Sequence, residues 1–163
     1  MHSTHNSDNR FDANRIFLKD TIRQQVDFSR TGQSRQLPAP PLQKACPPGV
    51  VRMALPDGAA ALARLGGMSI SEAITRRESV RTYAATPLTV EELAALLWAT
   101  QGVRKVLSPA SALRTVPSAG ARHAFETYVA VSRVEGLPSG LYRYLPFDGQ
   151  LAQLAVDEQI GLI

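Results

Sequence analysis

The sequence of 163 residues contains one cysteine, Cys46, and one tryptophan, and aromatic residues make up only 6% of it. A single cysteine excludes an internal disulfide and a metal site built from several cysteines. Two prolines follow Cys46 directly. We therefore interpret this thiol as incidental rather than catalytic.

Long hydrophobic runs are also missing. No apolar stretch approaches the ~20 residues of a membrane-spanning helix, and the N-terminal MHSTHNSDNRFD lacks the apolar core of a signal peptide. With 44% hydrophobic and 20% charged residues, the composition is that of a soluble globular domain of ordinary size. These features argue against a fibre or a membrane protein, and the expected compartment is the cytoplasm.

The positive charge is unevenly distributed. Residues 1–52 carry eight Lys/Arg and four Asp/Glu, whereas residues 53–163 carry ten of each, although the whole chain has a pI of 9.6. A nucleic-acid-binding face needs basic side chains gathered on a folded surface, and no such cluster is visible. We therefore expect no nucleic-acid partner, and we interpret the basic leader as a solvated segment.

The chain is predicted to divide at residues 56 and 57. Residues 1–56 form a polar leader, with a possible short helix at 14–26, followed by a proline-rich arm, QLPAPPLQKACPPGVVRMALP. Because proline lacks a backbone N–H and favours extended conformations, the arm should wrap over a surface rather than enter a sheet. Residues 57–163 carry the signals of a packed domain of helices and strands.

Two capping boxes predict helices in this domain. Ser69 and Glu72 predict a helix from Ile70 to about Arg77, with apolar residues at 70, 73 and 74 facing inward. Thr89 and Glu92 predict a second helix. Its inner face is expected to carry Leu93, Leu96, Leu97 and Thr100, and Gly102 is expected to end it in a left-handed conformation.

A β-hairpin is predicted after these helices. Residues 125–134 alternate and are rich in Tyr, Val and Thr, residues 135–140 supply a turn, and residues 141–145 can pair back. Phe147, Asp148 and Gly149 form a second turn. Tyr142 and Tyr144 alternate with Arg143, which places the two tyrosines in the core or in a subunit interface.

Arg77, Ser79 and Arg81 form the first candidate site. In an extended segment after a helix, residues at period two project to one side. Two guanidinium groups and a hydroxyl on one side suit a phosphate, because arginine donates paired hydrogen bonds and keeps its charge. Arginines at the end of a helix also complement its dipole, and the pattern alone leaves that alternative open.

The second candidate is the small-residue loop in RTVPSAGAR, residues 114–122. Ser118, Ala119 and Gly120 let the backbone approach a flat ligand and donate N–H groups to it. No G-x-G-x-x-G pattern is present and no strand is predicted directly before the loop, so it is no dinucleotide fingerprint. A tight connection remains the alternative, and His123 is interpreted as a packed or partly exposed residue rather than a general base.

Together these segments resemble the N-terminal half of the flavin-dependent nitroreductase family, specifically its SagB-type, azoline dehydrogenase-like branch. The resemblance rests on RRESVRTY, PLTVEELAALLWATQG, RTVPSAGARHAFETYV and VEGLPSGLYRY in this order, and it covers about residues 37–151. It implies an α+β fold, a nitroreductase-like α/β sandwich carrying the polar and proline-rich arm. It also implies an obligate homodimer with an FMN site at each subunit interface.

The resemblance also assigns roles to residues. Arg77, Ser79 and Arg81 are expected to contact the FMN phosphate and ribityl chain. The isoalloxazine is expected to lie along Pro117, Ser118, Ala119 and Gly120, with Arg122 as an extra contact. No catalytic residue and no metal ligand is assigned.

Two positions depart from the family pattern. Many relatives outside the branch have asparagine where Ala121 stands, so one side-chain contact to the flavin is missing. Relatives commonly have arginine or histidine where Glu78 stands, and an acid there repels a phosphate unless it points away.

The implied reaction in the SagB-type branch is oxidation of a peptide thiazoline or oxazoline to the azole. Other relatives pass electrons from NAD(P)H to nitroaromatics or quinones, so the substrate is a small molecule or a peptide. Family members continue past the position of Ile163, which leads us to expect a fragment or a second polypeptide supplying the rest. A helix after Asp157 would then leave Ile160, Leu162 and Ile163 uncovered. The alternative function is a flavin-free scaffold or partner subunit of a peptide-modifying complex.

Overall fold

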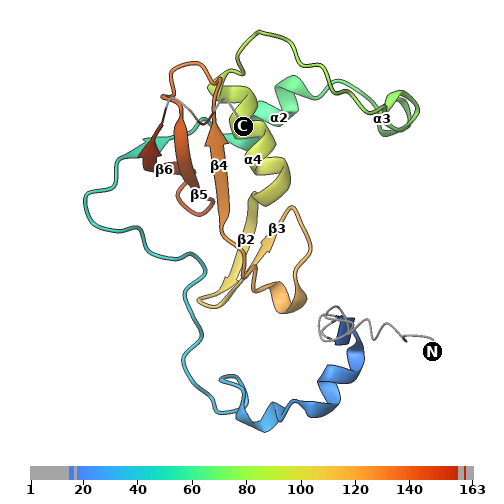
Figure 1. Ribbon diagram of the computed structural model, residues 1–163, viewed down its shortest axis with the longest axis vertical. Helices are drawn as coiled ribbons and strands as arrows, with labels where there is room; N and C mark the ends of the chain where they lie inside the picture. Colours follow the sequence, from blue (N-terminus) through green and yellow to red (C-terminus); the bar gives the residue numbers. More distant parts are fainter. Residues whose placement is uncertain (1–14, 17, 158–159, 161–163) are drawn as a thin grey trace, which may run out of the picture. The chain divides into compact units, whose positions relative to one another are not determined.

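The computed structural model describes residues 15–16, 18–157 and 160, and it divides into two compact units, residues 1–39 and 40–163 (Figure 1). The first unit contains two short 3-10 helices, η1 (Asp20–Gln25) and η2 (Phe28–Arg30). The Asp27 side chain accepts a hydrogen bond from the backbone N–H of Ser29 and so caps η2. The single leader helix predicted at 14–26 is only partly formed over the described residues: residues 15–16 are helical and residues 20–25 form η1, but residues 18–19 between them are not helical.

The second unit combines helices with two antiparallel sheets, which confirms the mixed α+β class. Its elements are β1 (Arg52–Ala54), α2 (Gly58–Leu65), α3 (Ile70–Arg76), α4 (Val90–Gln101), β2 (Val103–Ser108), β3 (Ser111–Arg114), η3 (Ala119–Ala121), β4 (Thr127–Val131), β5 (Gly140–Leu145) and β6 (Gln150–Val156). One sheet has the order β1-β6-β5-β4, and β2 pairs with β3 in the other.

The predicted hairpin is confirmed as β4 and β5. Thr127 lies opposite Tyr144, and Val131 lies opposite Gly140. The turn at residues 147–149 leads into β6, which pairs with β5 on its other side. Gly149 has φ 60°, a left-handed conformation that favours glycine in such a turn.

The end of the arm enters this sheet, contrary to prediction. Residues 52–54 form β1 and pair with residues 150–152 of β6. The prediction failed because the prolines lie on either side of this stretch, at Pro48 and Pro56. The three residues of β1 therefore keep the N–H groups that a ladder requires. The predicted boundary at residues 56 and 57 thus differs from the division between residues 39 and 40.

Helix α4 packs on the sheet and forms the core with it. Leu93 and Leu97 lie in one cluster with Val131, Tyr142, Tyr144 and Leu151. The capping box at Thr89 is formed in both directions, as predicted. Leu96 is 54% exposed and Thr100 is exposed, so the predicted inner face was wrong at these two positions. Ala94 and Ala95 are buried instead, because α2 packs on a second side of α4.

Gly102 ends α4 as predicted, but its conformation is not left-handed. Its φ is −58° and its ψ is 138°, which any residue can adopt. A Cβ atom on Gly102 would lie 2.5 Å from the carbonyl oxygen of Trp98. Glycine is needed here for a close approach to the last turn of the helix, and not for handedness.

Helix α3 has the predicted bounds but not the predicted burial. Ser69 accepts a hydrogen bond from the Glu72 backbone N–H, while the Glu72 side chain pairs with Arg76 at 3.0 Å, so half of the capping box forms. Ile70 is 80% exposed, Ile74 is 72% exposed, and Ala73 is also exposed. The inward face predicted for α3 is wrong within this chain, because every residue from 62 to 88 is exposed to solvent.

The capping box of α4 makes stability depend on pH. Hydrogen bonds from the backbone N–H and the hydroxyl of Thr89 lower the pKa of Glu92 below 4.5. A lowered folded-state pKa stabilises the fold above the unfolded pKa, and this contribution is lost as the pH falls through the folded pKa. We expect Glu92→Gln to destabilise the protein at about pH 7 and much less at about pH 3. Urea unfolding at both pH values checks this, and an equal difference at both would contradict it.

None of the helices in the described part of the chain combines the length and apolar character needed to cross a bilayer. The helix proposed after Asp157 falls mostly on residues 158–163, and all of these except Ile160 lie outside the described residues.

Candidate functional site

The small-residue loop at 117–123 has an unusual backbone. Gly120, Ala121 and His123 have φ values of 62°, 53° and 48°, all in the left-handed region. This region is favourable for glycine but costs an L-residue roughly 1–2 kcal/mol. Strained backbone of this kind persists only where surrounding contacts enforce it, and it is concentrated at ligand-binding and catalytic sites.

Fixed elements hold the start of this loop. β3 ends at Arg114 and leads into the loop, so the expectation that no strand precedes it was wrong. The backbone N–H of Thr115 donates to the Gly102 carbonyl at 3.0 Å, and its hydroxyl donates to the Trp98 carbonyl at 3.0 Å. Thr115, just before the loop, is therefore anchored on the C-terminus of α4 by two hydrogen bonds to residues that are distant from it in sequence.

The tip of the loop presents free donors. Pro117, Ser118, Ala119 and Gly120 are exposed. Within the described residues, the backbone N–H groups of Ala119 and Gly120 have no acceptor, whereas that of Ala121 donates to the Ser118 carbonyl. Exposed, adjacent N–H groups on a constrained loop suit the polar edge of a flat heterocycle.

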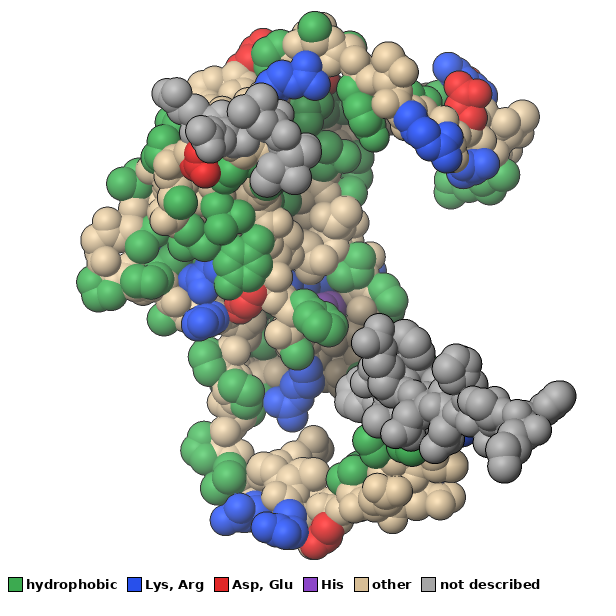
Figure 2. Space-filling model, viewed as in Figure 1, with side chains coloured by type: hydrophobic (Ala, Val, Ile, Leu, Met, Phe, Trp, Pro, Cys, Tyr) green, Lys and Arg blue, Asp and Glu red, His purple; other side chains and the backbone are tan. Residues whose placement is uncertain are grey.

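The other candidate residues follow α3. Arg77 caps the helix in an extended conformation, and residues 77–84 have no helix or strand, as the period-two interpretation requires. Arg76 pairs with Glu72, whereas Arg77 and Arg81 have no hydrogen bond or ion pair to any described residue. Figure 2 shows basic and acidic side chains close together around this segment. Its free guanidinium groups are available to an anion.

The structure does not bring the two candidate segments together within one chain. Arg77, Ser79 and Arg81 are exposed, and no described hydrogen bond or ion pair joins residues 70–83 to the loop. Helix α3 lies apart from the β2–β3 hairpin that carries the loop (Figure 1). Arg122, the remaining predicted contact, is exposed on the loop itself, and Glu78 is exposed beside the arginines.

A buried arginine lies directly before the loop. Arg114 is only 8% exposed, and its guanidinium lies 5.2 Å from the centre of the Phe147 ring. Burial lowers the pKa of Arg114, and the nearby Glu126 opposes that shift. Burial also raises the pKa of the neighbouring Tyr144, while the charge of Arg114 acts in the other direction. No local sequence pattern marks this arginine, because its environment is created by packing.

A second buried arginine fixes the arm on the sheet. Arg143 is 3% exposed and donates to the Lys44 carbonyl at 2.9 Å and to the Cys46 sulfur at 3.1 Å. Gln43 donates to Asp148 at 2.8 Å. The arm therefore covers part of the sheet as predicted, and Cys46 has a structural contact that its sequence context did not reveal.

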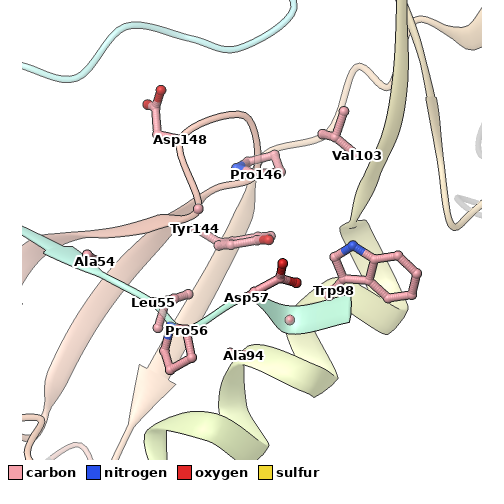
Figure 3. A pocket seen from close by; sticks show the side chains of 12 residues that line it. Ala54, Leu55, Pro56, Asp57, Ala94, Trp98, Val103, Tyr144, Pro146 and Asp148 are labelled. Carbon is pink, nitrogen blue, oxygen red and sulfur yellow. The ribbon is translucent and has the colours of Figure 1, made fainter. Parts of the chain in front are cut away.

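A pocket of about 370 Å³ opens between the N-terminus of α2, the end of α4 and the β5–β6 turn (Figure 3). Its lining includes Trp98, Tyr144 and two carboxylates, Asp57 and Asp148, but no lysine or arginine. Oδ1 of Asp57 caps α2 by accepting the N–H groups of Ala59 and Ala60. Because the only charged groups are acidic, the pocket does not suit a phosphate, and it contains none of the predicted site residues.

Comparison with known proteins identifies related chains. A model described as the nitroreductase family matches residues 74–159. A "putative nitroreductase" of Methanocaldococcus jannaschii is 36% identical over 94 residues, which are 58% of this chain and 45% of that protein. A crystal structure with the same description, from Anabaena variabilis, has a TM-score of 0.49 and 22% identity, covering 72% of this chain and 23% of that one. This chain therefore spans less than half the length of either relative.

Proposed function

Because the chain belongs to the nitroreductase family, we propose that it binds FMN and takes part in hydride transfer to or from an organic substrate. The observation that carries this proposal is the strained, exposed loop at 117–123 with its free N–H groups. Bound FMN supplies the two-electron chemistry, since its N5 accepts or donates a hydride. The chain's own residues bind and orient the cofactor.

The free guanidinium groups support a phosphate site at Arg77 and Arg81. Each can donate paired hydrogen bonds to phosphate oxygens, and Ser79 can add a hydroxyl. Arg76 pairs with Glu72, whereas Arg77 and Arg81 have no ion pair to a described residue, and the exposed Glu78 between them would have to point away from the phosphate. Pro117, Ser118, Ala119 and Gly120 would lie along the isoalloxazine, with Arg122 beside them.

One chain alone does not join these two groups of residues, so the proposal includes a homodimer. In it, the phosphate residues of one copy and the loop of the other complete a site. The exposed Ile70 and Ile74 support this, because large apolar side chains on a helix are usually buried against a partner. A second polypeptide that carries the equivalent loop would serve the same purpose.

The phosphate site is tested by removing both of its arginines. The purified wild-type protein, with FMN added, should be yellow and retain flavin absorbance through gel filtration. The double variant Arg77→Ala/Arg81→Ala should bind FMN at least about 100-fold more weakly, because two charge-assisted contacts are lost. Arg76→Ala is the matched control, since it removes the same group from a residue that is already paired, and it should keep the colour.

Two results would contradict the FMN proposal. One is a wild-type protein that stays colourless with excess FMN, which would instead favour a flavin-free scaffold or partner subunit. The other is a double variant that binds FMN as tightly as Arg76→Ala does.

For the reaction we propose the SagB-type one, oxidation of a peptide azoline to an azole. The motif order from RRESVRTY to GLYRY supports this branch. The azoline would lose a hydride to the flavin and a proton to solvent, so its mass falls by two hydrogens. Anaerobic mixing with a peptide thiazoline should bleach the bound flavin. Bleaching by NAD(P)H with turnover of a nitroaromatic, and no response to the thiazoline, would assign the other reaction of the family.

A further inference from the structure

His123 makes two hydrogen bonds, one that closes the small-residue loop and one that joins it to β3. Its backbone N–H donates to Oγ of Ser118 at 2.9 Å and closes the loop across five residues. Its ring Nε2 lies 3.1 Å from the carbonyl oxygen of Ala112, a fully buried residue of β3. A carbonyl only accepts, so Nε2 carries the hydrogen and donates it.

These bonds explain how the loop maintains a strained backbone. Three of the four residues from Gly120 to His123 are left-handed, and Ala121 has no side-chain group that could favour this conformation. Histidine is among the non-glycine residues that adopt this region more readily than most. The ring contact therefore fixes the end of the loop at β3, while Thr115 fixes its start at α4.

We propose that His123 is a positioning residue, which holds Ser118 to Ala121 in the one conformation that presents the Ala119 and Gly120 N–H groups outward. This inference rests on the proposed flavin role of the loop. A loop that is already ordered loses less conformational entropy when a ligand binds, so its affinity is higher. His123 acts on the ligand only through the loop backbone and does not itself contact the reacting atoms.

The test compares three variants of the purified protein with the wild type. His123→Leu removes the donor. His123→Gln keeps a side-chain N–H that can reach the Ala112 carbonyl, and His123→Asn tolerates the left-handed backbone but is too short to reach. Two properties are measured: hydrogen exchange of the Ala121 amide without flavin, because this amide donates to the Ser118 carbonyl and is released when the loop opens, and the Kd for FMN by flavin fluorescence.

We expect faster exchange and about tenfold weaker FMN binding for His123→Leu and His123→Asn, with His123→Gln close to the wild type. A merely structural role would lower the urea midpoint of all three without this rescue by glutamine. If His123→Leu does not fold, the comparison of glutamine with asparagine serves alone. Equal exchange in all variants, or equal FMN affinity of those that fold, would overturn the proposal. If the wild type binds no FMN, the proposed function fails, and unchanged exchange alone would overturn the role of His123.

Discussion

Replacing Tyr142 with alanine is expected to lower the free energy of unfolding by about 3–5 kcal/mol. Tyr142 is fully buried in the cluster between α4 and the sheet. Truncation removes its aromatic contacts and leaves a cavity that the surrounding strands can fill only in part. It also leaves the Pro138 carbonyl and the Gln153 amide without the hydroxyl that bonds both, at 2.7 and 3.1 Å.

Two further variants separate these contributions. Tyr142→Phe keeps the ring and loses only the hydroxyl, so it should cost about 1–3 kcal/mol. Tyr128→Ala removes the same side chain from β4, where it is 53% exposed, and should cost at most about 1 kcal/mol. Urea unfolding at one protein concentration compares all three. Equal losses for the alanine variants at 142 and 128 would show that the described core does not determine stability.

Replacing Gly102 with alanine is expected to destabilise the protein by about 1–3 kcal/mol. Two effects oppose each other here. Alanine restricts the unfolded chain, which alone would stabilise by about 0.4–1 kcal/mol, and the backbone angles of Gly102 permit it. However, the new Cβ would lie 2.5 Å from the Trp98 carbonyl oxygen and 2.6 Å from a carbon of its indole ring. The clash exceeds the entropic gain, because a carbonyl in a helix cannot move without breaking other bonds.

Gly67→Ala is the matched control for this prediction. A Cβ on Gly67 would meet no atom within 4 Å, so only the entropic gain remains. Fluorescence of Trp98, the single tryptophan, reports the unfolding midpoint and also the packing beside Gly102. A Gly102→Ala protein as stable as Gly67→Ala would contradict the described packing of the α4 C-terminus.

Elements specified by local chemistry were predictable from the sequence. Helix α4 begins at a reciprocal cap between Thr89 and Glu92, and the β4–β5 hairpin follows from alternating residues around a turn. These signals lie within a few residues of one another, so no distant contact is needed to read them. The β2–β3 hairpin was not predicted, because its strands show no regular alternation. Helix α2 was not predicted although Asp57 caps it, because Ala60 stands where a capping box has an acidic residue or glutamine.

The candidate site likewise combines features that the sequence predicted with features that only the tertiary structure revealed. The sequence by itself indicated the family, the arginines at 77 and 81 and the small-residue loop, because these are contiguous motifs of residue type. Only the tertiary structure decided that Thr115 and His123 hold this loop, that Arg114 and Arg143 are buried, and that the two candidate segments remain apart in one chain. The physical reason is that burial and left-handed strain arise from contacts between residues far apart in sequence, which no local pattern records.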